Sequence, residues 1–249
     1  MKRLVKHVFS ALGIEIRLIR NVVANREREK RDAVKQKWAM LKRYAPKSIL
    51  DIGANEGQSA ALLRELFPGV PICSFEPLAD CFRQVETFLS DNGPGKAFHY
   101  ALGDATETTT IHRSEFSPSS SLLAMDSLHK SEFPQTANSR LEEIEVRRLD
   151  DLADEMSLEP PIVIKVDVQG FEGRVIAGGK ETFGRAAALV IELTSYPLYQ
   201  SQSTFEDVQD QLQVLGFVFR GVIDQMHSPK DGRILQFDAL FENARRISQ

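Results

Sequence analysis

Two short stretches of the 249-residue chain combine glycines with acidic residues at the spacing of a nucleotide-binding site. The first, LDIGANEGQ, holds Asp51, Gly53 and Gly57, and the second, SFEP, ends an apolar run at Glu76, nineteen residues after Gly57. Glycine permits a positive φ and leaves backbone N–H groups open to a ligand. An acidic residue at the end of the next strand can accept both hydroxyls of a ribose. Together the two stretches predict a cofactor that contains a nucleoside.

The residues between the two glycines distinguish between nucleoside cofactors. A dinucleotide site has the pattern G-x-G-x-x-G, whereas three residues, including Asn55 and Glu56, separate Gly53 from Gly57. The carboxylate of Glu56 would repel a pyrophosphate. It favours a cationic ligand, and S-adenosylmethionine carries a sulfonium and an amino group but no phosphate. The sequence also lacks the motifs Tyr-x-x-x-Lys, G-x-S-x-G and G-x-x-x-x-G-K-[ST].

Short apolar runs alternate with helical patterns after residue 47, which is typical of βαβ units in a parallel sheet. The last two expected strands, FVFRGVI and ILQFDALF, are joined by DQMHSPKDGR, which is too short for a helical crossover, so we expect them to pair antiparallel. We therefore predict an α/β fold with a mostly parallel, Rossmann-like sheet and a C-terminal hairpin. The other expected strands are SILDIG, PICSFE, AFHYAL, IVIKVDV and ALVIELT, and the expected helices are QSAALLREL, LADCFRQVETFLS, FEGRVIAGG and TFEDVQDQLQVL.

Residues 106–149 interrupt this alternation with serine, proline and other polar residues. A connection of this length is uncommon in a compact domain, so we interpret it as a lid, a substrate loop or a disordered stretch. Its SPSSSL segment either donates hydroxyl groups to a sugar-like acceptor or forms a polar turn.

Six motifs resemble, in order, those of the FkbM-type S-adenosylmethionine-dependent methyltransferases. They are LDIGANEGQ, SFEP, ALGD, SSSL, RRLDDL and IKVDVQGFEGRVIAGG. The resemblance covers roughly residues 48–243 and implies a seven-stranded methyltransferase sheet. It also implies transfer of a methyl group, usually to an oxygen of a small molecule or sugar. Glu56 departs from the family, whose loops often carry a small or apolar residue there.

The resemblance places the cofactor at the two acidic turns and at the end of the third expected strand. The first turn would line the methionine and ribose side, and Glu76 would take the ribose hydroxyls. Asp104 would meet the adenine amino group, with a plain turn in GDAT as the alternative role. The implied cofactor residues are Asp51, Gly53, Asn55, Gly57, Glu76, Leu102 and Asp104.

Two carboxylates in IVIKVDVQGFEG are candidates for the base that takes the proton of an acceptor hydroxyl. Asp167 is the first candidate and Glu172 the second. Most of the acceleration of methyl transfer can come from alignment of the reacting atoms, and a base adds about 10²–10⁴-fold. The structural alternatives are a hydrogen bond from Asp167 that closes the loop at Gly170 and a first-turn helix charge for Glu172. Glu192 ends the fifth expected strand at the same rim and is a weaker candidate for the acceptor pocket.

Charge separates an N-terminal extension from the rest of the chain. Residues 1–47 carry 14 Lys/Arg and 4 Asp/Glu, so the remainder is acidic within a total of −4. We predict a basic helical extension at residues 1–47 and an S-adenosylmethionine-binding domain at residues 48–249. Apolar residues recur at helical spacing among the first twenty. Such a helix docks against its own domain or a partner, or lies on a membrane surface.

Composition excludes several other classes. No apolar run approaches the ~20 residues that span a bilayer, and the N-terminus lacks the features of a signal peptide, so we expect a cytoplasmic protein, peripheral to a membrane at most. Cys73 and Cys81 lack metal or disulfide spacing, and we expect no metal; Asp150 and Asp151 either bind a divalent ion or cap a helix. The acidic domain argues against a nucleic-acid acceptor.

The favoured function is therefore an O-methyltransferase that acts on a hydroxyl of a carbohydrate or another small molecule. Two alternatives stay open at this point. One is an NAD(P)-dependent oxidoreductase on a related sheet, which the glycine spacing and the missing Tyr/Lys pair disfavour. The other is a non-catalytic module that the basic extension attaches to a membrane or a protein complex.

Overall fold

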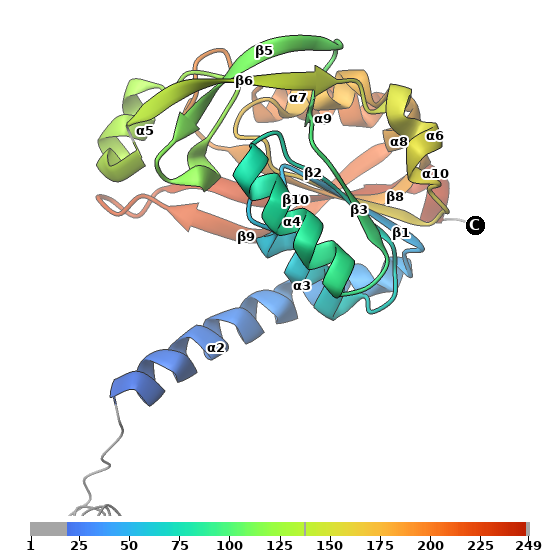
Figure 1. Ribbon diagram of the computed structural model, residues 1–249, viewed down its shortest axis with the longest axis horizontal. Helices are drawn as coiled ribbons and strands as arrows, with labels where there is room; N and C mark the ends of the chain where they lie inside the picture. The colour runs from blue at the N-terminus through green and yellow to red at the C-terminus, as the bar shows by residue number, and fades with distance from the viewer. Residues whose placement is uncertain (1–18, 137, 248–249) are drawn as a thin grey trace, which may run out of the picture. The chain divides into compact units, whose positions relative to one another are not determined.

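The structure is a computed structural model that describes residues 19–136 and 138–247 (Figure 1). Contacts divide the chain into two units, residues 1–39 and residues 40–249. In the first unit, helix α2 (Ile19–Trp38) contains the mixed-charge run NREREKRDAVKQKW that was expected to be helical. The amphipathic helix predicted at the N-terminus falls mainly on residues 1–18, which lie outside the described residues. Within the described ranges, no helix is both long and apolar enough to cross a membrane.

The second unit is built on a seven-stranded sheet in the order β3-β2-β1-β7-β8-β10-β9. The first five strands in this order are parallel to one another, and β10 is antiparallel to both β8 and β9. This confirms the predicted α/β fold and the C-terminal hairpin. The strands are β1 (Ser48–Ile52), β2 (Ile72–Phe75), β3 (Gly95–Phe98), β7 (Ile162–Val166), β8 (Ala186–Thr194), β9 (Phe217–His227) and β10 (Ile234–Asn243).

Helices cover both faces of this sheet, which explains why β1, β2 and β7 are buried along their whole length. One face packs against α7, α8 and α9 in a core that includes Ile52, Ile164 and Ile176, and α3 and α4 lie on the other face (Figure 1). The helices are η1 (Ala39–Tyr44), α3 (Gln58–Leu66), α4 (Ala79–Asp91), α7 (Glu172–Gly178), α8 (Lys180–Arg185), α9 (Phe205–Val214) and α10 (Ala244–Ile247).

Residues 106–149, which we interpreted as a lid, a substrate loop or a disordered stretch, contribute two strands to a second sheet, so the disordered stretch was wrong. The lid and the substrate loop stay predictions, because residues between these two strands line the cavity described below. Strands β5 (Glu107–Ser114) and β6 (Ser139–Arg147) pair antiparallel, and β4 (Ala101–Leu102) joins the far side of β6. Only one face of this sheet is buried, through Ile111, Ile144 and Val146, while threonine, glutamate and arginine face outward. Because few apolar residues mark these strands, the sequence analysis did not detect them. The shorter elements here are η2 (Ser117–Ser119), α5 (Ser127–Glu132), η3 (Pro134–Thr136), η4 (Asp150–Leu152) and α6 (Ala153–Met156).

The expected third strand, AFHYAL, is divided between the two sheets. Its first part lies in β3 beside β2, and its last two residues are β4 in the second sheet. The chain therefore leaves the main sheet at Phe98, before it reaches Asp104. Asp150, expected either to bind a divalent ion or to cap a helix, accepts hydrogen bonds from the backbone of Glu181 and Thr182 at the start of α8, and so caps α8.

Candidate active site

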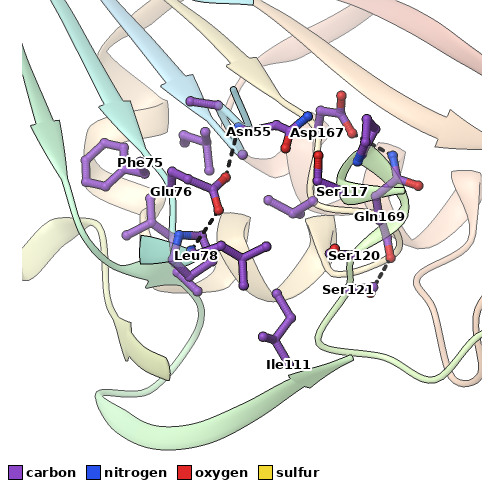
Figure 2. A pocket seen from close by; sticks show the side chains of 18 of the residues that line it. Asn55, Phe75, Glu76, Leu78, Ile111, Ser117, Ser120, Ser121, Asp167 and Gln169 are labelled. Atoms are coloured by element: carbon purple, nitrogen blue, oxygen red, sulfur yellow. Dashed lines mark hydrogen bonds between the residues drawn. The ribbon is translucent and has the colours of Figure 1, made fainter. Parts of the chain in front are cut away.

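A cavity of about 310 Å³ lies at the carboxyl ends of β1, β2 and β7, where open α/β sheets bind ligands. Figure 2 shows Phe75, Glu76 and Leu78 on one side of it and Asp167 and Gln169 on the other. The second sheet, the residue before it and the segment between β5 and β6 also line the cavity, and contribute Tyr100, Leu102, Ile111, Leu122 and three serines. The apolar side offers a wall for a flat ring, while the opposite side is polar.

The turn from β1 into α3 brings the main chain close to the end of β7. Gly53 has φ +80°, and a Cβ placed on it would lie 1.9 Å from the carbonyl oxygen of Asp167. No other residue fits there. Asn55, with φ +47°, and Gly53 line the cavity, whereas Gly57 caps α3 at φ +91° and is not on the cavity wall. The three residues thus shape one turn, and two of them face the predicted cofactor space.

Glu76 is held at the tip of β2 by two backbone N–H groups. Asn55 donates to one carboxylate oxygen and Leu78 to the other, each at 2.8 Å. Each oxygen keeps a second lone pair for a ligand. Burial raises the pKa of Glu76 to about 7, against the two hydrogen bonds, which lower it. The carboxylate is therefore oriented before any ligand binds, as recognition of a diol requires.

Asp51 does not reach the cavity wall. Its side chain is buried on β1, where one oxygen accepts a 3.3 Å hydrogen bond from Ser74 and the other has no partner among the described residues. Burial raises its pKa despite the neighbouring ammonium of Lys165, its partner in the β1–β7 pairing. Asp51 therefore lies behind the cavity wall, next to Lys165, which lines the polar side of the cavity.

Lys165 and Asp167 form an ion pair at the end of β7, with Nζ 3.0 Å from Oδ2. Both residues line the cavity. Burial alone would raise the pKa of Asp167, but the charge of Lys165 and hydrogen bonds from neighbouring side chains outweigh it and hold the pKa below its ordinary value. Asp167 therefore lies on the cavity wall in a setting that favours its ionised form, which can accept a hydrogen bond.

Gln169 is a site residue that the sequence analysis missed. Its side-chain nitrogen donates to Asp167 at 2.7 Å and also to Glu192, and its side-chain oxygen accepts from the Tyr199 hydroxyl at 2.8 Å. Gln236 donates to the same oxygen at 3.3 Å. The position of Gln169 inside the VDVQG motif could have identified it as a site residue. Its partners Tyr199 and Gln236 lie far away in the sequence, and no local motif marks them.

Besides Asp51 and Gly57, two more predicted residues, Glu172 and Asp104, do not line the cavity. Glu172, at the first position of α7, is buried and accepts the backbone N–H groups of Gly170 and Val168 at 3.0 and 3.3 Å. Glu172 thus lies in the first turn of α7, as its structural alternative predicted, and its carboxylate also closes the loop at Gly170, which had been the structural alternative for Asp167. Asp104 is exposed and pairs with Arg174 at 3.4 Å, since the chain has already crossed to the second sheet. Leu102, two residues earlier, does line the cavity.

The donor set of the cavity fits S-adenosylmethionine. Glu76 presents a fixed acceptor for ribose hydroxyls, and Leu78, Leu102 and Ile111 supply an apolar wall for adenine. Among the described residues that line the cavity, Lys165 is the single cation, and it is already paired with Asp167. A pyrophosphate would thus find no free positive charge, whereas a ligand with a sulfonium and an amino group meets carboxylates.

Residues 51–219 match the model of the methyltransferase FkbM domain. The chain belongs to the FkbM methyltransferase family. Its cofactor is S-adenosylmethionine, and the match decides against the alternative of an oxidoreductase. The 2-O-methyltransferase NoeI of Sinorhizobium fredii is 33% identical to this FkbM methyltransferase over 177 residues, which cover 66% of the present chain and 70% of NoeI.

Solved methyltransferase structures are also similar to the FkbM methyltransferase. Magnesium protoporphyrin IX methyltransferase from Synechocystis, solved with bound S-adenosylmethionine, is 11% identical with a TM-score of 0.46, and the match covers 98% of the present chain and 97% of that one. Fibrillarin from Aeropyrum pernix is 11% identical with a TM-score of 0.44, over 78% of this chain and 66% of its own.

Proposed function

We propose that this methyltransferase transfers the methyl group to a hydroxyl oxygen of a carbohydrate or another hydroxylated small molecule. The observation that carries the proposal is the ionised carboxylate of Asp167 on the polar wall of the cavity, opposite the ribose-binding carboxylate of Glu76. An ionised carboxylate can accept a hydrogen bond from a neutral hydroxyl and so orient its oxygen. The similarity to a protein named as a 2-O-methyltransferase supports the same assignment.

Glu76, Asn55, Leu102 and the β1–α3 turn would hold the cofactor. S-adenosylmethionine supplies an electrophilic methyl carbon next to a sulfonium. The chain contributes alignment, because the acceptor oxygen must approach that carbon in line and at near contact.

The serines on the rim have mainly a structural role. The Ser121 hydroxyl donates to the backbone oxygen of Gln169 at 2.7 Å, and the Ser120 hydroxyl accepts from the backbone of Ser114 at 3.1 Å. The first bond attaches the segment after β5 to the loop after β7, and the second attaches it to the end of β5. Ser117, the third serine of this segment on the wall, makes one long contact to Glu56 at 3.5 Å and has capacity for an acceptor hydroxyl.

The test is a transfer assay with methyl-labelled S-adenosylmethionine and a panel of sugars, polyols, phenols, amines and carboxylic acids. We expect label in the hydroxylated compounds, in a product that resists alkaline hydrolysis as an ether does and an ester does not. Asp167→Asn should lower kcat by about 100-fold or more, whereas Asp104→Asn, a matched change at an exposed carboxylate, should not. Label only in amines or esters would contradict the assignment of a hydroxyl acceptor.

A further inference from the structure

Side chains from three strand ends meet behind the polar wall of the cavity. Asp167 follows β7, Glu192 is near the end of β8, and Asp238 of β10 lies directly opposite Glu192 in the antiparallel pairing. Lys165 reaches the same place from within β7. The described residues therefore bring three carboxyl groups and one ammonium together at one edge of the sheet.

One amide nitrogen joins two of these carboxyl groups. Gln169 donates from Nε2 both to Asp167 and to Glu192, so the two carboxyl groups lie within reach of each other. Gln236 donates to Gln169 Oε1 at 3.3 Å and to Glu192 at 2.9 Å, and Tyr199 also donates to Gln169 Oε1. Because these donors fix the oxygen of Gln169, its nitrogen must face the carboxyl groups.

We propose that Asp167 and Glu192 act as a carboxyl pair that receives the proton of the acceptor hydroxyl and then shares it. Asp167 touches the acceptor from the cavity wall, and Glu192, behind it, is a positioning residue that strengthens Asp167 as a base. Gln169 holds the two groups together. The inference rests on the proposed hydroxyl acceptor and extends it to the residues that accept the proton.

The electrostatics of the cluster support a shared proton. Burial and the charges of Asp167 and Asp238 raise the pKa of Glu192 well above its ordinary value, and Lys165 opposes them only in part. Two carboxyl groups in contact do not both ionise readily, so the pair titrates as a unit. The other titratable groups that act on the pair are Tyr199, Glu172 and Asp51.

The proton transfer balances without a further reactant. The O–H bond of the acceptor breaks, its electron pair stays on oxygen and forms the bond to the methyl carbon, and the proton joins a carboxylate oxygen of Asp167. The bond from the methyl carbon to the sulfonium sulfur breaks, its electron pair goes to sulfur, and S-adenosylhomocysteine leaves. The pair is fully ionised before the step, passes from two negative charges to one as it takes up the proton, and gives the proton to water after product release. The fully ionised pair takes up its first proton more readily than Asp167 would if Lys165 were its only charged neighbour, so the pair is the stronger base.

The first test needs neither cofactor nor acceptor. In the protein labelled with carbon-13 at its carboxyl groups, the NMR signal of Glu192 is the one that Glu192→Gln removes. We expect this signal to titrate well above the ordinary range of a glutamate, and the Asp167 signal to respond in the same step. Separate titrations, each close to the ordinary pKa of an isolated carboxyl group, would overturn the pair. A coupled titration without any transfer to hydroxyls would instead overturn the proposed function.

The second test is the pH profile of kcat/KM. Glu192→Gln should move the acid limb of the profile down by about one pH unit or more and lower kcat by about tenfold, with the Kd for S-adenosylhomocysteine unchanged. The matched control is Glu242→Gln, which removes a buried carboxylate of β10 that pairs with Arg220. An acid limb that stays in place in Glu192→Gln, or that moves equally in Glu242→Gln, would refute the role of Glu192.

Discussion

The backbone N–H of Asn55 donates a 2.8 Å hydrogen bond to the carboxylate of Glu76, and so connects the turn after β1 with the end of β2. The glycine-containing turn after β1 and the acidic end of β2, which together predicted a nucleoside cofactor from the sequence, are therefore joined by a direct hydrogen bond. Asn55 adopts a positive φ to aim its N–H group at Glu76. The bond leaves the outer side of the carboxylate open to the cavity.

Glu76→Gln tests the diol contact. The amide nitrogen of glutamine would face one of the two N–H donors, and the charge-assisted bond to ribose would be lost. We expect the Kd for S-adenosylhomocysteine to rise by about 10- to 100-fold, equivalent to about 1.5–3 kcal/mol, when measured by isothermal titration calorimetry. Asp104→Asn, at an exposed carboxylate, is the control and should bind normally. Equal weakening in both variants would contradict the assigned roles.

Glu172 predicts a pH dependence of stability. Burial raises the pKa of Glu172 in the native state to about 7, above its pKa in the unfolded state. Between these two pKa values the native state binds more protons than the unfolded state. The free energy of unfolding must therefore fall as the pH rises through this window. The loss is at most about 1.4 kcal/mol per pH unit for one group. Glu172→Gln should remove this contribution, as measured by urea denaturation from about pH 5 to pH 8.

The matched variant at this position is Glu172→Ala. A single side-chain oxygen of Glu172 accepts both backbone N–H groups, so glutamine can keep them and alanine cannot. At neutral pH we expect Glu172→Ala to destabilise by about 1–3 kcal/mol and Glu172→Gln to be neutral or stabilising. A large activity loss in a stably folded Glu172→Gln would restore Glu172 as a base.

Gly53→Ala should lower the free energy of unfolding by far more than the strain of a positive φ alone would. The new Cβ would meet the Asp167 carbonyl oxygen at 1.9 Å, so the ends of β1 and β7 must separate. Gly69→Ala is the control, because Gly69 also has a positive φ, +84°, but has nothing within 4 Å of its added Cβ. We expect about 1–2 kcal/mol for the control and a larger loss, with loss of cofactor binding, for Gly53→Ala. Similar values in urea denaturation would argue against the close approach.

Lys165→Met should destabilise the protein and change its pH profile. Removal of the ammonium leaves Asp167 and its acidic neighbours without their countercharge, at a cost of about 3–5 kcal/mol for a buried pair. The pKa of the carboxyl cluster should rise, so the acid limb of kcat/KM should move to higher pH, opposite to the shift expected for Glu192→Gln. A shift in the same direction in both variants would contradict the charge arrangement.

The basic N-terminal extension predicts a contact with an anionic surface. Residues 1–47 carry an excess of lysine and arginine, and their attraction to acidic lipids would weaken with salt. We expect the full chain to sediment with vesicles rich in phosphatidylserine at low ionic strength, and Val8→Asp with Phe9→Asp to reduce the effect. Sedimentation with neutral vesicles alone, or none at all, would favour docking of the helix against protein.

The sequence by itself determined the main sheet, the two acidic turns and the position of Asp167, because each depends on residues close together in the chain. Gly53 and Glu76 sit at strand ends, where the alternation of apolar runs and helices locates them. The second sheet was missed, since its strands bury one face only and carry charged residues on the other.

Only the tertiary structure decided which side chains face the cavity and which meet behind it. Asp104 lies outside the cavity because the chain passes to the second sheet after Phe98. Glu172 accepts hydrogen bonds from the backbone of its own loop. Gln169, Glu192, Tyr199 and Gln236 come together from separate strands and loops. Contacts of this kind depend on strand order and register, which bring distant residues to one edge of the sheet without any local pattern in the sequence.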